Sequence, residues 1–139
     1  MSEIITNKLT GKTAAGDVTI TSEGGAVTFQ LQQGLAKAFA SIDQDSTGHP
    51  TYDSLNIAST TDSSTGETTV AFTNNMNNAN YILTGGSQCE NESATYFGTI
   101  GKDSSFPMTT SDFRTDARNS AGTSQDSKYL AMAVHGDLA

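Results

Sequence analysis

The sequence predicts an all-β protein: an antiparallel six-stranded sandwich or flattened barrel preceded by an N-terminal β arm. Ser, Thr, Asn and Gly supply 59 of the 139 residues, a composition that suits short strands and turns better than long helices. Several short runs alternate apolar and polar residues, as strands with one buried face do. A chain of this length is expected to form one domain, or one domain with an arm.

The most informative segment is residues 65–83, in which two alternating runs flank a tip built largely of Asn. In the first run, Val70 and Phe72 alternate with Thr and Ala. In the second run, Tyr81 and Leu83 repeat the pattern. Each run therefore offers one face to a core, and the segment is expected to form a β-hairpin or a sheet corner.

The expected sandwich occupies residues 52–139. Its six strands are predicted over residues 54–60, 68–73, 79–84, 95–100, 109–114 and 129–135. The side chains expected to point inward are Leu55, Ile57, Val70, Phe72, Tyr81, Leu130, Met132 and Val134. Residues 31–51 are expected to connect this domain to the arm through a helical turn over residues 30–36, a strand over residues 37–42 and a loop.

The first thirty residues differ from the rest of the chain. Two brief alternating runs, over residues 17–21 and 26–30, are separated by a Gly-containing turn. A hairpin this small is not stable alone, so it must dock on the C-terminal domain, on sister chains or on a larger particle. Residues 1–30 are therefore predicted to be an anchoring arm.

The charge of the chain argues against nucleic acid as a partner. The formal net charge is −8 with a pI near 4.4, whereas nucleic-acid binding needs clustered Lys and Arg. No apolar run approaches the length of a membrane span, and no signal-like segment opens the chain, so we expect the protein to begin at Met1 and to assemble in the cytoplasm. Cys89 is the one cysteine, so stability must come from packing or subunits rather than from an intrachain disulfide.

No motif for catalysis, metal or cofactor is complete. Residues 43–54 begin like a calcium-binding EF-hand loop, but the fifth position is Thr47, and Ser54 stands at the twelfth position, where a bidentate acid is needed. This favours a solvated turn, although a weak site near Asp43 and Asp45 stays conceivable. His49 is expected in that loop, and His135 on the strand face opposite Leu130. Nothing pairs either histidine with one serine, and no aromatic platform accompanies the acids. The protein is expected not to be an enzyme, with no catalytic residue, metal or cofactor.

Two loops are candidate receptor-binding sites. Residues 88–105 combine an amide, an aromatic ring and a carboxylate in Asn91, Tyr96 and Asp103, the mixture that sugar recognition needs. At the Asn-rich tip, Asn75 and Asn77 offer amide donors and acceptors. The structural alternatives are a strand containing Tyr96, and a tip in which Asn tolerates turn geometry while Met76 fills the core.

The order of several segments resembles the C-terminal domains of bacteriophage tail-fibre and related virion proteins. These segments are GLAKAFASID, DSLNIASTTD, TGETTVAFTNNMNNANYIL, FPMTTSDFRT and KYLAMAVHGD. The spacing of Phe72, Met76 and Tyr81, with the closing YLAMAV run, is similar to the trimeric six-stranded H-type lectin fold. The resemblance implies a homotrimer, in which the face carrying His135 would line the axis.

The resemblance further implies a structural protein of the virion, a tail-fibre-like adhesin for host attachment. Its partners would be other virion proteins, held through the N-terminal arm, and host surface glycans, with neither nucleic acid nor membrane insertion. The alternative is a capsid decoration protein that stabilises or ornaments the head. The shortness of the chain favours this alternative, because tail fibres usually contain a long shaft.

Overall fold

A computed structural model of the chain describes residues 18–21, 28–88, 99–102, 105–119 and 121–139. The chain forms two compact units, Met1–Leu35 and Ala36–Ala139. In the first unit, strand β1 (Thr19–Thr21) pairs antiparallel with β2 (Thr28–Gln30), and a helical turn, α1 (Leu31–Gly34), follows. The two alternating runs of this region thus pair with each other, and the helical turn lies within the predicted range.

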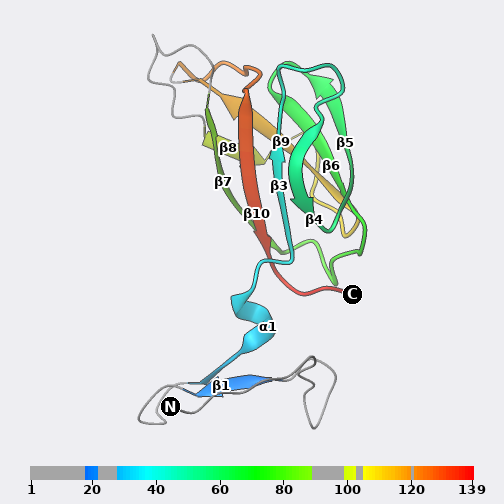
Figure 1. Cartoon of the computed structure of the whole chain (residues 1–139), viewed down its shortest axis with the longest axis vertical. Helices are drawn as coiled ribbons and strands as arrows, with labels where there is room; N and C mark the ends of the chain where they lie inside the picture. The colour runs from blue at the N-terminus through cyan, green and yellow to red at the C-terminus, as the bar shows by residue number, and fades with distance from the viewer. Residues whose placement is uncertain (1–17, 22–27, 89–98, 103–104, 120) are drawn as a thin grey trace. The chain divides into compact units, whose positions relative to one another are not determined.

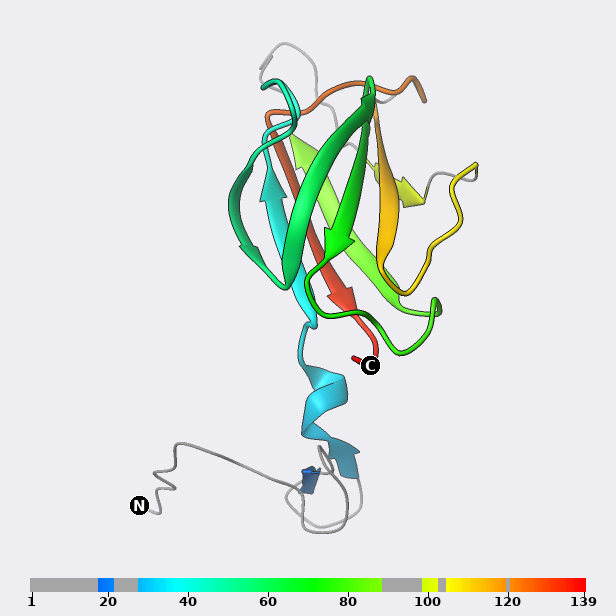
Figure 2. The same cartoon turned by 90° about the vertical axis from the view of Figure 1, so that its right-hand side faces the viewer.

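The second unit is a sandwich of two antiparallel sheets (Figure 1). Sheet I has the strand order β4-β3-β10-β7, and sheet II has the order β5-β6-β9-β8. Figure 2 shows the green strands β5 and β6 of sheet II in front of the red strand β10 of sheet I. The strand bounds are β3 Ala38–Ile42, β4 Thr51–Leu55, β5 Ile57–Ser64, β6 Glu67–Phe72, β7 Ile82–Gln88, β8 Thr99–Lys102, β9 Asp112–Arg118 and β10 Tyr129–His135.

The all-β class with two antiparallel sheets is confirmed, but the described part of this unit contains eight strands where six were predicted. One extra strand is β3, which was expected in the connecting segment and instead lies between β4 and β10 inside sheet I. The compact unit accordingly starts at Ala36, before the predicted domain boundary at residue 52. The other extra strand arises because the predicted run 54–60 divides into two.

Asn56 divides that run. Its backbone is left-handed, with φ of 57°, a conformation that Asn tolerates better than most residues. Its side-chain oxygen accepts a hydrogen bond from the backbone N of Asn74 at 2.7 Å, and its amide donates to the carbonyl of Asn74 at 3.1 Å. The chain turns here from β4 of sheet I to β5 of sheet II. Because of this turn the inward prediction for Leu55 is wrong: its side chain is half-exposed, whereas Ile57 packs against the core.

The core lies between the inner faces of the two sheets. It contains the predicted Val70, Phe72, Tyr81, Leu130, Met132 and Val134, together with Ala38, Ala40, Ile42, Met76, Phe113 and Ala117. At its centre Phe113 contacts two other rings, with centroid distances of 5.4 Å to Phe72 and 6.1 Å to Tyr81. Strands β6 and β10 show the burial alternation that the sequence predicts, so the register of both is confirmed.

Two strands begin three residues later than predicted, because hydrogen-bonded turns occupy their expected first residues. Asn80 donates its backbone N–H to the side chain of Asn78 before β7. Thr109 donates its hydroxyl to the carboxylate of Asp112 at 2.7 Å before β9. Such side-chain turns satisfy backbone groups that would otherwise join the sheet.

The Asn-rich tip packs against the end of the chain. Met76 is buried and forms an isolated antiparallel bridge with Leu138. The backbone N of Asn77 donates to the carbonyl of Asp137 at 2.8 Å, and the N of Ala139 donates to the carbonyl of Asn75 at 2.9 Å. In the described part of the chain no helix has the length and apolar character needed to cross a membrane.

Candidate functional site

The outer faces of the two sheets differ in chemistry. On sheet II the outward Arg114 lies 3.6 Å from the Glu67 carboxylate and donates from Nε to the hydroxyl of Thr69 at 3.2 Å. Its guanidinium also lies 4.5 Å from the ring centroid of Phe106. This face is therefore covered by polar and charged side chains that bind one another.

The outer face of sheet I is built from small, hydroxyl-bearing and aromatic side chains. Its register aligns Ser41 of β3 with Asp53 of β4 and with Ala131 of β10, which in turn faces Gly86 of β7. A groove of about 440 Å³ crosses this face. Its lining residues are Phe39, Ala40, Ser41, Asp53, Thr84, Gly85, Gly86, Ala131, Met132 and Ala133. The alternation of β10 makes this groove possible, because Ala131 and Ala133 stand where larger outward side chains would fill it.

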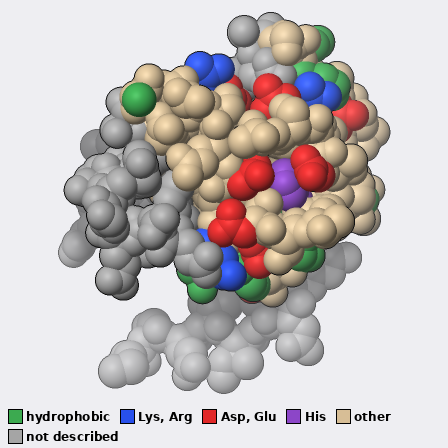
Figure 3. Space-filling view, turned by 90° about the horizontal axis from the view of Figure 1, so that it is seen from above, with side chains coloured by type: hydrophobic (Ala, Val, Ile, Leu, Met, Phe, Trp, Pro, Cys, Tyr) green, Lys and Arg blue, Asp and Glu red, His purple; other side chains and the backbone are tan. Residues whose placement is uncertain are grey.

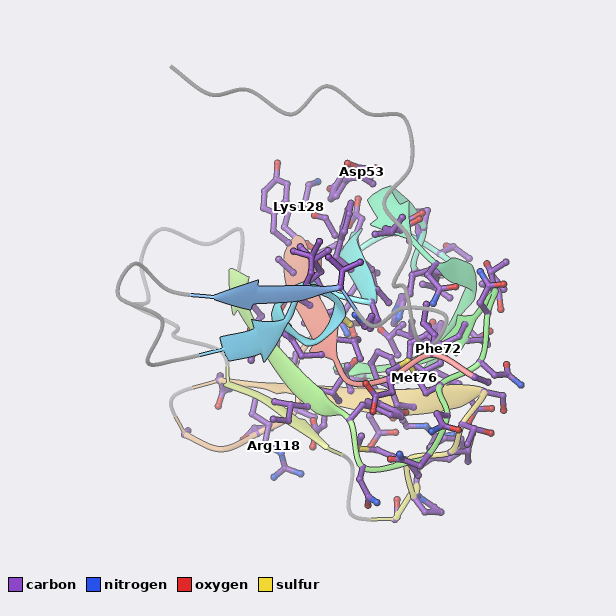
Figure 4. The ribbon with its side chains drawn as sticks, turned by 90° about the horizontal axis from the view of Figure 1, so that it is seen from below. Asp53, Phe72, Met76, Arg118 and Lys128 are labelled. Carbon is purple, nitrogen blue, oxygen red and sulfur yellow. The ribbon has the colours of Figure 1, made fainter. Side chains whose placement is uncertain are left out.

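Two tyrosines lie on the same face. The rings of Tyr52 and Tyr129 are stacked, with centroids 5.3 Å apart and planes inclined by 30°. Both side chains are about half-exposed, at 49% and 47%. Tyr129 is outward because it alternates with buried Leu130, whereas Tyr52 reaches it through a register shift between Ser41 and Ile42. Figure 4 shows the side chains of Asp53 and Lys128 on one side of the unit, away from those of Phe72 and Met76.

Asp43 holds the ring of Tyr52 in place. The Tyr52 hydroxyl and the Ser46 hydroxyl both donate to the Asp43 carboxylate, the latter at 2.9 Å. Burial acts to raise the pKa of Asp43, but these hydrogen bonds and the charge of Lys128 outweigh it, and the pKa lies below its ordinary 3.8. Burial and the Asp43 carboxylate raise the pKa of Tyr52, so its hydroxyl stays a donor.

We expect Asp43→Asn to lower the stability of the protein at pH 7, and the difference from wild type to shrink as the pH falls below 3.8. A carboxylate whose folded pKa is depressed stabilises the fold above its unfolded pKa and loses this effect as the pH falls through the folded value. Urea unfolding of both proteins at pH 7 and pH 3 measures the difference. Asp137→Asn, at an exposed position, is the control; an undiminished difference at pH 3 would contradict the assignment.

A buried polar cluster closes one end of the sandwich. Gln44 donates from Nε2 to the Thr68 hydroxyl at 2.9 Å and to the carbonyl of Gly66 at 3.1 Å, and its oxygen accepts from the N of Ser127 at 3.2 Å. Nδ1 of His49 is hydrogen-bonded to the same Thr68 hydroxyl at 2.7 Å. The cluster therefore ties the loop after β3 to the β5–β6 turn and to the segment before β10.

These contacts correct the prediction of a solvated turn over residues 43–54. Residues 45–48 are exposed, but Asp43, Gln44 and His49 are buried. Nε2 of His49 lies 3.6 Å from the half-exposed carboxylate of Asp62. Figure 3 looks onto an end of the unit at which acidic side chains surround a histidine. Because the Thr68 hydroxyl is fully buried, a substrate has no access to it, and the arrangement suits holding the loop in place.

The other histidine and the acids also have defined places. His135 lies on the outer face of sheet I opposite Ile82, on the face that the sequence predicted. Within the residues that the structure describes, no three His, Cys, Asp or Glu side chains are grouped closely enough to hold a metal ion. The region of Asp43 and Asp45 is instead organised by hydrogen bonds from Ser46 and from the backbone of Asp45.

Of the five predicted receptor-binding residues, the structure describes only Asn75 and Asn77, and it does not bring these two together with the tyrosine pair. Asn91, Tyr96 and Asp103 lie outside the described residues. Asn75 and Asn77 are exposed, but they pair with the chain beyond the far end of β10, whereas Tyr129 is its first residue. The features of this face that sequence reasoning missed are Tyr52, Tyr129 and the groove. The alternation of β10 marks Tyr129 as outward, whereas no local pattern marks Tyr52.

Comparison of the chain with protein-family profiles, with curated proteins and with solved structures finds no match.

Proposed function

We propose that the protein is a structural component of a bacteriophage virion, a tail-fibre-like adhesin that attaches the particle to the host surface and acts without enzymatic chemistry. The observation that carries the proposal is the contrast between the two sheet faces. Sheet I exposes Tyr52, Tyr129 and an open groove, while sheet II covers its outer face with mutually bound polar groups. An exposed aromatic surface on a soluble unit is typical of an interaction site.

The division of the chain supports the same proposal. Met1–Leu35 and Ala36–Ala139 are separate compact units, which suits one segment that anchors and one that is displayed. The β1–β2 hairpin has three residues in each strand, too few for independent stability. It therefore requires a partner surface, which we assign to other virion proteins and to sister chains in a homotrimer.

The test compares particles that carry the full chain with particles assembled without it. An adhesin should place antibody label on the tail, and its loss should abolish attachment to host cells while particles survive heating as before. Light scattering of the purified chain should return the mass of a trimer, which is three times 14.5 kDa. A chain that lacks its first 35 residues should fail to be incorporated into particles.

The opposite pattern would overturn the adhesin proposal. Label over the head, normal attachment and heat-sensitive particles would instead identify a capsid decoration protein. A monomeric mass at micromolar concentration would refute the trimer. This result would not distinguish the adhesin from the decoration protein, because the mass reports only the number of copies.

A further inference from the structure

We propose that the groove of sheet I, together with the stacked Tyr52 and Tyr129 rings on the same face, is a binding site for a neutral oligosaccharide. This inference rests on the proposed adhesin function and names its receptor class and site. It differs from the loop sites expected from the sequence, because it lies on a sheet face formed by four strands, β4, β3, β10 and β7.

The tyrosine pair supplies a flat apolar surface held in one orientation. The rings are inclined by only 30°, each is about half-exposed, and the Tyr52 hydroxyl is bound to Asp43. A fixed ring loses little conformational entropy when a ligand stacks on it. The C–H faces of a pyranose ring are the sugar surface that an aromatic face accommodates, and the ring edge leaves hydroxyls free for hydrogen bonds.

The groove has the size and floor that a sugar chain needs. Its volume of about 440 Å³ lies within the roughly 300 to 1,000 Å³ typical of small-molecule sites. Gly86, Ala131 and Ala133 line it with little or no side chain. A Cβ placed on Gly86 would meet no atom within 4 Å, so the space above this residue is open. A ligand can therefore approach the sheet backbone closely at this point.

The polar groups of the groove suit hydroxyls rather than charged ligands. Ser41, Thr84 and Asp53 offer two hydroxyls and one carboxylate, a set that can donate to and accept from sugar hydroxyls. Asp53 is the one charged side chain among the described lining residues. The lining has no basic side chain, and the charge of Lys128, near the tyrosine pair, is opposed by the Asp43 carboxylate; with a net charge of −8, an anionic glycan would be repelled. The charge distribution therefore selects a neutral glycan.

A second copy of the chain is the competing occupant of this face. Leu55 and Ile82 are exposed on it at 50% and 62%, and a trimer axis lined by His135 would bring copies together here. The two occupants make different demands on the same residues. A glycan needs the ring faces and an open groove in the assembled protein, whereas a second copy would bury both and depend on them for its association.

The experiment uses two variants that alter the site in different ways. Tyr129→Ser removes one ring, and Gly86→Val adds a side chain to the groove at a position where a Cβ would meet no atom within 4 Å, with a residue that strands favour. Leu138→Ser and Ala58→Val are the matched controls, because both residues are exposed and lie outside the groove lining. All five proteins, wild type included, are applied in full length to an array of neutral hexose and N-acetylhexosamine oligosaccharides, and light scattering measures their masses.

We expect each site variant to lose about tenfold or more in affinity for the array glycan that wild type binds, which is the scale of one stacked ring. The control variants should bind as wild type does, and all masses should be equal. In near-ultraviolet circular dichroism, the tyrosine signal of wild type should change on addition of that glycan, because Tyr52 and Tyr129 would be in contact with it.

Three results would overturn the proposal. If glycan binding survives in both site variants, the binding site lies elsewhere on the protein. The adhesin function would still stand as long as wild type attaches to host cells. A lower mass for Tyr129→Ser with no glycan bound by wild type would assign the face to a second copy. If no protein binds the array and all masses are unchanged, the glycan-site proposal is wrong. The proposed adhesin function would be refuted as well only if wild type also failed to attach to host cells.

Discussion

Replacing Gly66 with Ala is expected to destabilise the Ala36–Ala139 unit by about 4 kcal/mol or more, a loss at the severe end for a single substitution. Gly66 follows Thr65 in the β5–β6 turn with a φ of 77°, a conformation that L side chains rarely adopt. A Cβ at this residue would lie 2.6 Å from the carbonyl oxygen of Ala117 and 2.6 Å from the backbone N of Gln125. Both are backbone atoms, which cannot rotate aside as a side chain can.

Because Gly66 is hydrogen-bonded to the buried polar cluster, the substitution to Ala should also weaken that cluster. Its N donates to the Asp126 carboxylate at 2.6 Å, and its carbonyl accepts from the N of Ala117 at 2.8 Å and from Nε2 of Gln44 at 3.1 Å. Any shift that relieves the clash lengthens these bonds. A buried amide left without an acceptor costs free energy of its own, about 1 to 3 kcal/mol.

Gly122→Ala separates the effect of backbone conformation from the effect of the clash. Gly122 has nearly the same φ, 79°, but a Cβ there would meet no atom within 4 Å. Its replacement should therefore cost only the left-handed conformation, about 1 to 2 kcal/mol. Urea unfolding of wild type and both variants gives the comparison. Equal losses would show that the turn adjusts to a side chain and that the close approach of residues 117 and 125 is not required.

The strands whose burial alternates strictly were the ones that the sequence predicted best. Strand β10 was predicted with its observed bounds, because Leu130, Met132 and Val134 repeat with the period of a half-buried strand. Strand β6 differs by one residue at each end from its predicted range. In both strands hydrophobic burial decides the register, and hydrophobic burial is readable in a sequence.

Features that depend on contacts distant in the chain were not predictable in this way. Asn56 divides one predicted strand through hydrogen bonds with Asn74, eighteen residues further on. Gln44 is buried because it binds Thr68 and Ser127, the latter 83 residues away, although its neighbours in sequence are turn residues. Local composition predicts a solvated loop at such a place, since nothing nearby reveals that a partner will cover it.

The candidate binding face shows the same limit. Tyr129 follows from the alternation of β10, and the groove follows from the small residues Ala131 and Ala133 on the same face. Tyr52 depends on a register shift between Ser41 and Ile42, which places it beside a ring that is 77 residues away in the chain. Pairing register is a property of two strands together, so one strand alone does not predict it.

Replacing Phe113 with Ala is expected to cost about 3 to 5 kcal/mol, a large part of the stability of a small domain. Phe113 has no exposed surface and contacts the rings of Phe72 and Tyr81, so its loss leaves a cavity between these two rings. The Tyr81 ring is also held by its hydroxyl, which donates to the carbonyls of Thr109 and Asp112, each at 3.0 Å. Because these bonds keep Tyr81 in place, it cannot collapse into the space.

Phe106→Ala is the matched control, since it removes the same ring from a half-buried position. Phe106 packs under the guanidinium of Arg114. A cation–π contact of this kind at an exposed site contributes about 0.5 to 1 kcal/mol to stability. Urea unfolding at pH 7 should therefore show a loss for Phe113→Ala several times that for Phe106→Ala. Similar losses for the two variants would contradict the burial of Phe113 between the sheets, because a ring that water already reaches has little transfer free energy to lose.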